Sequence, residues 1–292
     1  MKLKQKIAKL LTLFRDFAVR RKNVIIALAV AAGAVIFAFI IRKSALTDDT
    51  SYGDAPLYFT TSTNMVVPGV ENLKEYSELK PLPVYAQLHE KNPDMAGWLR
   101  IDGMVIDYPV MLTPGDEDFY LGKDFNGSEN VNGSLILDTD CNVGTGVRAD
   151  NYMYVDENGE VIYDPPSDNI IIHGHTMKNG NMFGDLDLYQ EESFGKEHRI
   201  MEFDTLYEKR KYELISVFYT QVYYDNEDEF KFYQFFDAAT QEEFDEWYRN
   251  IKEKSIYDTG VTAAFRDEFL TLSCCSYQVE NGRFVVIGKR IE

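Results

Sequence analysis

Apolar residues alternate with polar ones, or form short apolar runs, over most of the chain beyond residue 97. Two such segments flank Asp102-Gly103, and Asp-Gly between apolar segments is typical of a β-hairpin turn. The same patterns predict strands at residues 98–101, 105–110, 133–138, 169–172, 201–203, 212–222, 269–273 and 283–287. About eight strands with few helices predict a mostly β fold, closed into an eight-stranded barrel with peripheral helices. Residues 141–168 are predicted to form a long loop that contains a small hairpin.

One helix is well specified by the sequence. Thr240 is followed three residues later by Glu243, the spacing of a capping box at a helix start. Phe244, Trp247 and Ile251 then recur at helical spacing. The pattern predicts a helix with one apolar face.

Near the start of the chain, residues 24–41 contain neither charge nor proline. An apolar run of this length approaches the roughly 20 residues that span a bilayer core. Basic residues flank both ends and are more numerous on the N-terminal side, which favours a cytoplasmic N-terminus. A cleaved signal peptide is the alternative, but the run is long for one and no clear cleavage site follows. We therefore predict one N-terminal transmembrane helix.

The predicted organisation has four parts. Residues 1–23 are a basic cytoplasmic segment, 24–41 a transmembrane anchor, 42–70 an extracellular linker rich in small and polar residues, and 71–292 a catalytic domain. The net charge also changes along the chain: residues 1–43 carry +9, and the remaining residues carry −27. A domain with this much negative charge repels the phosphate backbone of a nucleic acid, which excludes nucleic acid as a partner.

The chain has three cysteines, Cys141, Cys274 and Cys275, and an odd number leaves at least one thiol free. Cys275 ends an apolar strand, and a turn at Asn281-Gly282 would return the chain to Arg283 at the same rim of the sheet. A nearby cation lowers the pKa of a thiol, and an arginine can hold a developing oxyanion. Spacing alone slightly favours the alternative, in which the cysteine is buried in the core and the arginine is a surface charge.

Two histidines follow the apolar strand at residues 169–172. His175 lies on a loop after Gly174, where it could protonate a leaving amine. His173 lies where the strand is still apolar, so we expect a half-buried packing or hydrogen-bonding residue. The pair could also bind metal together with Cys274 or Asp138, but two histidines without a second spaced pair are a weak zinc signal. We predict no metal site and no cofactor.

Several segments together resemble class B sortases. They lie in order between about residue 80 and residue 292, and they include GWLRIDGMVIDYPVM, YLGKDFNG, GSLILD, NIIIHGHTMKNGNMFGDLDLY, IKEKSIYDTGV and LTLSCCSYQVENGRFVVIGKRI. The resemblance implies a sortase-type barrel in which Cys275 is the nucleophile, His175 the general acid and base, and Arg283 the oxyanion donor. It also implies substrate contacts near the nucleophile, for which the candidates are Cys274, Ser273 and Thr271.

The chain departs from the family pattern at three places. Cys274 replaces the usual Thr before the nucleophile, and His173 replaces the usual Tyr before Gly-His. The loop at residues 141–168 is longer than usual and begins with Cys141. These departures bear on which sorting signal the cleft accepts.

The resemblance implies a membrane-anchored cysteine transpeptidase whose catalytic domain lies outside the cell. Its partners would be exported proteins with a C-terminal sorting signal, of the Asn-Pro-x-Thr kind, and an amine of a peptidoglycan precursor or of a pilin. Cleavage would occur at the Thr carbonyl through a thioester. Two alternatives remain: a membrane-anchored cysteine peptidase that releases its product to water, and a non-catalytic wall-associated assembly module with an inert cysteine.

Overall fold

The computed structural model describes residues 79–224 and 226–292. The predicted cytoplasmic segment at 1–23, anchor at 24–41 and linker at 42–70 lie outside the described residues. Within the described ranges, no helix combines the length and the apolar character needed to cross a membrane.

Ten strands are described: β1 Met95–Arg100, β2 Asp107–Met111, β3 Leu135–Leu137, β4 Met153–Val155, β5 Val161–Tyr163, β6 Asn169–Gly174, β7 Ile200–Thr205, β8 Lys211–Gln221, β9 Phe269–Cys275 and β10 Gly282–Arg290. The described α-helices are α2 Pro83–Lys91, α3 Glu192–Glu197 and α4 Gln241–Lys254. Short 3₁₀ turns lie at η1 Phe119–Gly122, η2 Arg148–Asp150, η3 Leu186–Gln190 and η4 Phe232–Gln234.

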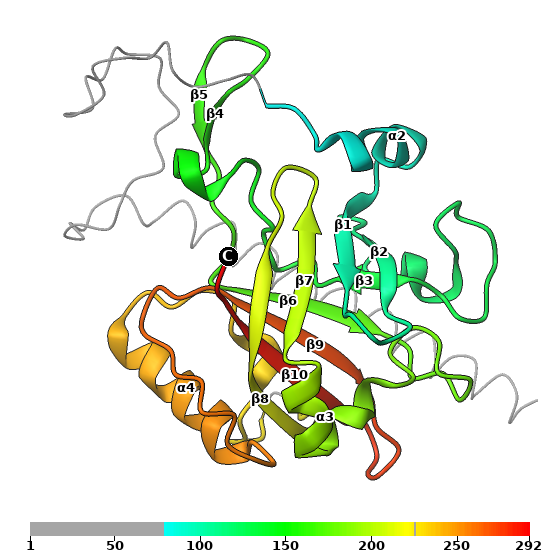
Figure 1. Cartoon of the computed structure of the whole chain (residues 1–292), viewed down its shortest axis with the longest axis vertical. Helices are drawn as coiled ribbons and strands as arrows, with labels where there is room; N and C mark the ends of the chain where they lie inside the picture. Colours follow the sequence, from blue (N-terminus) through cyan, green and yellow to red (C-terminus); the bar gives the residue numbers. More distant parts are fainter. Residues whose placement is uncertain (1–78, 225) are drawn as a thin grey trace, which may run out of the picture. The chain divides into compact units, whose positions relative to one another are not determined.

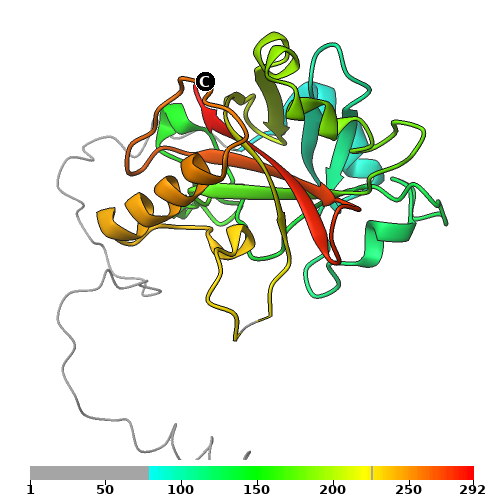
Figure 2. The ribbon, with the colours of Figure 1, turned by 90° about the horizontal axis from the view of Figure 1, so that it is seen from below.

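Eight of these strands form a closed barrel in the order β1-β2-β3-β6-β9-β10-β8-β7, with β7 returning to β1 (Figures 1 and 2). Most neighbouring strands are antiparallel, but β2–β3 and β6–β9 are parallel pairs. The closed, mostly β architecture predicted from the sequence is confirmed, and all eight predicted barrel strands are present. The parallel β6–β9 pair matters most for the site, because it joins strands about a hundred residues apart.

The barrel interior is apolar. Leu99, Ile171, Leu272 and Val286 are fully buried in one cluster that fills it. In β7 burial alternates along the strand, as expected when one face points inward. β9 is buried on both faces until its last residue, because a second cluster covers its outer side.

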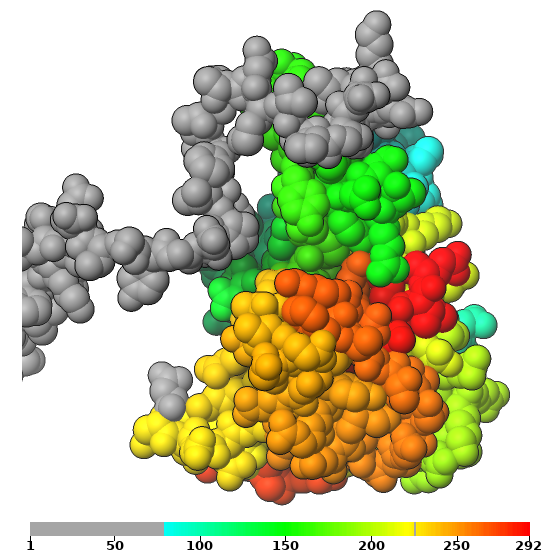
Figure 3. Space-filling model, turned by 90° about the vertical axis from the view of Figure 1, so that its left-hand side faces the viewer, coloured from blue at the N-terminus to red at the C-terminus, as the bar shows by residue number. Residues whose placement is uncertain are grey.

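The second cluster forms beneath α4, as its amphipathic pattern predicts. Phe244, Trp247 and Ile251 pack against Phe269 and Val285 on the outside of the barrel. Figure 3 shows the yellow and orange segment that includes α4 covering this face. The segment between β8 and β9 therefore forms a wall beside the strands that carry the candidate site.

The start of α4 differs slightly from a complete capping box. The Thr240 hydroxyl accepts a hydrogen bond from the Glu243 amide at 3.2 Å, as predicted. The Glu243 carboxylate accepts from the amide of Ala239 at 2.8 Å, one residue before the cap. The backbone N–H groups of both Glu243 and Ala239 are therefore hydrogen-bonded at the helix start. Such a cap stabilises a helix by about 1 kcal/mol.

The long loop at residues 141–168 contains the predicted hairpin as a separate two-stranded sheet, β4–β5. Buried polar groups attach this loop to the barrel. The Tyr152 hydroxyl accepts from Arg290 at 2.6 Å, and Arg290 forms an ion pair with Glu268 at 2.6 Å. The loop is thus fixed to the end of β10 that lies away from Arg283.

Candidate active site

The two adjacent cysteines face opposite sides of β9. Cys275 is exposed, whereas Cys274 is only 2% exposed and belongs to the barrel interior. Successive residues of a strand point to opposite faces, which explains the difference. Burial raises the pKa of Cys274 to about 12, and burial likewise raises the pKa of Cys141. The alternative of a core-buried Cys275 is therefore wrong, and only this cysteine offers an accessible thiol among the described residues.

Arg283 lies directly across the β9–β10 hairpin from Cys275. Residues paired in this way project from the same face, with Cβ atoms about 5 Å apart. The hairpin is tight, since Asn281 has a left-handed φ of 55° and a side chain at Gly282 would collide with the Ser276 carbonyl. The predicted return of the chain to the same rim is confirmed.

The Arg283 guanidinium is half-buried and partly engaged by the turn. Its Nη1 donates to the Gly282 carbonyl at 3.0 Å and lies 3.4 Å from the Asn281 carbonyl. Among the described residues its hydrogen bonds use only Nη1, which leaves N–H groups on Nε and Nη2. These donors are fixed by the turn and are of the kind that stabilises an oxyanion.

His175 follows β6 immediately, and the parallel register brings it to the same rim. Gly174 pairs with Cys274, so continuing the register by one residue places His175 beside Cys275. The next residue, Thr176, links the end of β6 to the end of β9, because its hydroxyl donates a hydrogen bond to the Cys275 carbonyl at 2.6 Å. Thr176 is a contact that sequence reasoning missed.

The His175 ring is oriented by a backbone carbonyl. Its Nε2 lies 2.7 Å from the Leu121 oxygen, and a carbonyl can only accept a hydrogen bond. Nε2 therefore carries the hydrogen, and Nδ1 is the nitrogen left to gain or lose a proton. Gly133 allows the backbone to approach this carbonyl closely. It adopts a left-handed φ of 61°, and a side chain there would collide with the Leu121 carbonyl.

His173 has a different role from His175. It is half-buried, and its Nε2 lies 3.2 Å from the Asp138 carboxylate, which confirms the expected hydrogen-bonding residue. A joint metal site of both histidines with Cys274 does not form, because Cys274 faces the barrel interior. Within residues 79–224 and 226–292, the group close enough to hold a metal ion consists of Glu117, Asp138 and His173, with ligand atoms within 4.8 Å of one another.

These three residues line a cleft of about 510 Å³ that reaches Arg283. We call this the acidic cleft, because its wall includes Glu117, Asp138 and Asp140. The segment between β8 and α4 also lines this cleft, with the aromatic residues Phe232, Tyr233 and Phe236.

The candidate substrate-binding residues of β9 have distinct environments. The Thr271 hydroxyl donates to the Asn169 side chain at 2.8 Å, so it links two strands. Ser273 is 1% exposed, and its hydroxyl has no hydrogen-bond partner among the described residues. Cys274 packs inside the barrel. Of the three, Ser273 is the one whose polar group has no partner among the described residues, and it is buried and does not line the acidic cleft.

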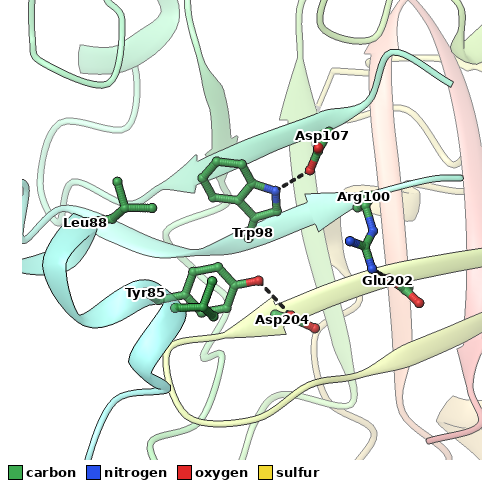
Figure 4. A pocket seen from close by; sticks show the side chains of 8 residues that line it. Tyr85, Leu88, Trp98, Arg100, Asp107, Glu202 and Asp204 are labelled. Atoms are coloured by element: carbon green, nitrogen blue, oxygen red, sulfur yellow. Dashed lines mark hydrogen bonds and ion pairs between the residues drawn. The ribbon is translucent and has the colours of Figure 1, made fainter.

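A smaller pocket of about 180 Å³ lies on the outer face of β1 beside α2 (Figure 4). Its polar groups are paired with one another. Tyr85 donates to Asp204 at 2.7 Å, Trp98 donates to the carboxylate of Asp107 at 2.6 Å, and Arg100 forms an ion pair with Glu202. β1 lies four strands from β9 in the barrel order, so this pocket is separate from the Cys275 rim.

Comparisons with known proteins find class B sortases, both by sequence and by structure. No family model matches the chain. Sortase B of Listeria monocytogenes is 29% identical over 207 residues, which cover 70% of this chain and 72% of that protein. Sortase B of Staphylococcus aureus is 27% identical over 212 residues, covering 72% and 75%.

Solved structures give the same result. Sortase B from Bacillus anthracis, in complex with AAEK1, matches with a TM-score of 0.56 and 27% identity over 75% of this chain and 91% of that one. The Staphylococcus aureus sortase B–substrate complex matches in fold, with a TM-score of 0.58 and 24% identity over 73% and 87%. The resemblance to class B sortases inferred from the sequence is confirmed by these relatives.

Proposed function

We propose that this chain, a sortase-type transpeptidase of class B by its relatives and its fold, uses Cys275 to cleave a C-terminal sorting signal of exported proteins. The observation that carries the proposal is the pairing of the exposed Cys275 with Arg283 across the hairpin. The hydrogen bond from Thr176 to the Cys275 backbone supports a place for His175 at the same rim.

In the first step the Cys275 thiolate attacks the Thr carbonyl of the sorting signal. The carbonyl electrons move to oxygen, and N–H groups of Arg283 stabilise the resulting oxyanion. The C–N bond then breaks as the amine leaves with a proton from His175, and a thioester remains on Cys275. The contact of Nε2 with the Leu121 carbonyl supports Nδ1 as the nitrogen of His175 that transfers this proton.

In the second step an amine attacks the thioester. The attacking amine, from a peptidoglycan precursor or a pilin, loses a proton to His175 as the new C–N bond forms. The C–S bond breaks, and Cys275 leaves as the thiolate that began the cycle. Two steps with a good leaving group replace one difficult amide exchange.

Ser273 is the substrate-binding residue that we favour, because its buried hydroxyl has no partner among the described residues. For Cys274 and Thr271 the environment supports packing and strand linkage instead. A substrate group that hydrogen-bonds to Ser273 would remove the cost of a buried, unsatisfied hydroxyl.

The acceptor distinguishes transpeptidation from hydrolysis. With an Asn-Pro-x-Thr peptide and a simple amine such as triglycine, we expect the new amide as the main product. Free acid as the main product at saturating amine would instead support a peptidase. A protein that neither cleaves nor reacts selectively with a thiol reagent at neutral pH would support an inert assembly module.

Replacing Arg283 with Lys is expected to lower turnover by roughly 100-fold, the scale of losing one oxyanion donor. Lysine keeps the charge but loses the planar donor geometry. The measurement is peptide-cleavage kinetics, with circular dichroism to verify the fold. Arg199→Lys is the matched control, because Arg199 is exposed and forms an ion pair with Glu213 at 3.3 Å. Near-normal turnover of Arg283→Lys would assign the oxyanion to backbone N–H groups.

The predicted location is the cell membrane, crossed once by residues 24–41, with residues 42–292 outside. The basic segment before the apolar run favours this orientation. External protease on intact cells should therefore remove the catalytic domain while a cytoplasmic marker survives. Protection of the domain under those conditions would contradict the orientation.

A further inference from the structure

Thr176 joins the segment that carries His175 to the strand that carries the nucleophile. It directly follows His175, and its half-buried hydroxyl donates a hydrogen bond to the Cys275 carbonyl at 2.6 Å. β6 ends at Gly174, so the regular pairing of β6 with β9 ends at Gly174 and Cys274. Beyond that pair, the Thr176 hydroxyl continues the connection between the two segments.

The Cys275 side of this hydrogen bond is already fixed by β10. Cys275 pairs with Arg283, and the Ser276 amide donates to the Gly282 carbonyl at 2.9 Å. The backbone of the nucleophile is thus held along its other edge. The hydrogen bond from Thr176 therefore constrains the partner that has left its strand, which is the segment that begins with His175.

That segment folds back on itself. The Phe183 amide donates to the His175 carbonyl at 3.0 Å, and an isolated bridge pairs Thr176 with Met182. The Leu121 carbonyl contacts the His175 ring at Nε2 and so restricts its orientation. The Thr176 hydroxyl contacts β9 itself, so it restricts the distance between the segment and Cys275.

The same hydroxyl also interacts with the buried cysteine beside the nucleophile. Burial raises the pKa of Cys274 to about 12, and a hydrogen bond with Thr176 opposes that rise. A hydroxyl donates one hydrogen bond and can accept others, so one side chain can serve the last two residues of β9. Valine has nearly the same shape as threonine but would lose both interactions.

We propose that Thr176 is a positioning residue, whose hydrogen bond to the Cys275 carbonyl holds His175 at the distance that proton transfer requires. This inference rests on the proposed function. A general acid must come within about 3 Å of the atom that it protonates, and a displacement of about 1 Å can lower a rate by up to roughly 100-fold. Thr176 acts on the reaction only through His175.

The first test removes the hydroxyl and then restores it. In Thr176→Val protein we expect the kcat of peptide cleavage to fall roughly tenfold with KM unchanged, the scale of one hydrogen bond that orients a group without binding substrate. Thr176→Ala should show the same loss. Thr176→Ser keeps the hydroxyl and should retain nearly full kcat.

The matched control is Thr259→Val. The Thr259 hydroxyl also donates to a backbone carbonyl on a strand, that of Ile215 at 3.2 Å. Ile215 lies in the middle of β8, away from Thr220, which pairs with Arg283. This variant should keep its kcat, and thermal unfolding of each protein verifies that it is folded.

A double-mutant cycle then shows whether Thr176 acts through His175. Thr176→Val is introduced into His175→Ala protein, and turnover is measured with imidazole in the buffer. Free imidazole is not attached to the segment, so we expect the second substitution to cause no further loss. A tenfold loss that persists in His175→Ala protein would assign the hydroxyl to the placement of Cys275 and overturn the inference.

Other outcomes would overturn it as well. An unchanged kcat in Thr176→Val would do so, as would a raised KM at full kcat, which would indicate substrate binding. The proposed function fails separately, if the unsubstituted protein forms no thioester or if His175→Ala protein is fully active. Full activity of Thr176→Val beside an impaired His175→Ala protein would overturn the positioning role alone.

Discussion

Cys275→Ala protein is expected to lose cleavage of a sorting-signal peptide altogether. Removing a covalent nucleophile costs on the order of 10⁶ in turnover, because no other group can form the intermediate. Neither remaining thiol can substitute, since Cys274 and Cys141 are buried and burial raises the pKa of both. The measurement is release of a fluorophore from a quenched peptide at neutral pH.

The matched control is Cys274→Thr, which gives the residue usual in the resembled family. Cys274 faces the barrel interior, so we expect this protein to remain folded and active. Circular dichroism separates a folding defect from a catalytic one. An inactive but folded Cys274→Thr protein, together with an active Cys275→Ala protein, would reverse the assignment of the nucleophile.

His175→Ala protein is expected to lose turnover by roughly 10²- to 10⁴-fold, the contribution of a general acid and base. Its thiol should still be present and exposed, so the loss concerns proton transfer. Imidazole added to the buffer should restore part of the activity, which a purely structural role would not allow. Peptide-cleavage kinetics with and without imidazole provide the measurement.

The control for this prediction is His198→Gln. His198 lies between α3 and β7, and its Nδ1 contacts the carbonyl of Asp102, which follows β1, four strands from β9 in the barrel order, at 2.8 Å. Its replacement should change turnover little. If His175→Ala retained full activity, the proton would have to come from another group or from water.

Local patterns in the sequence predicted much of the fold. The Asp102-Gly103 and Asn281-Gly282 turns each join the strands that they were expected to join. Alternation and apolar runs located the barrel strands, and the cap at Thr240 located α4. These features depend on neighbours in the chain, which is why sequence alone sufficed.

Pairings between distant segments were not predictable in the same way. The parallel β6–β9 pair joins residues about a hundred positions apart, and no local pattern specifies it. The Leu121 carbonyl that orients His175 has no sequence signature, because every residue carries a carbonyl. The acidic cleft likewise needs residues from three segments to meet.

The residues of the candidate site also differ in whether local sequence patterns could predict their positions. The return of the chain from Cys275 to Arg283 at one rim followed from a hairpin turn and could be predicted from spacing, but spacing alone did not favour a catalytic role for either residue. The place of His175 followed only from the resemblance to a family, and the β6–β9 register now gives it a physical basis. The exposure of Cys275 was contrary to what spacing alone favoured, because the strand stops being covered at its last residue.

The central claim is that Cys275 carries the acyl group between donor and acceptor. The most direct test is the intact mass of the protein after brief incubation with an Asn-Pro-x-Thr peptide and no amine, followed by acid quenching. We predict a mass gain equal to the acyl fragment, mapped to the peptide that contains Cys275 and lost on addition of triglycine. No adduct while the peptide is being cleaved, or an adduct on another residue, would contradict the account.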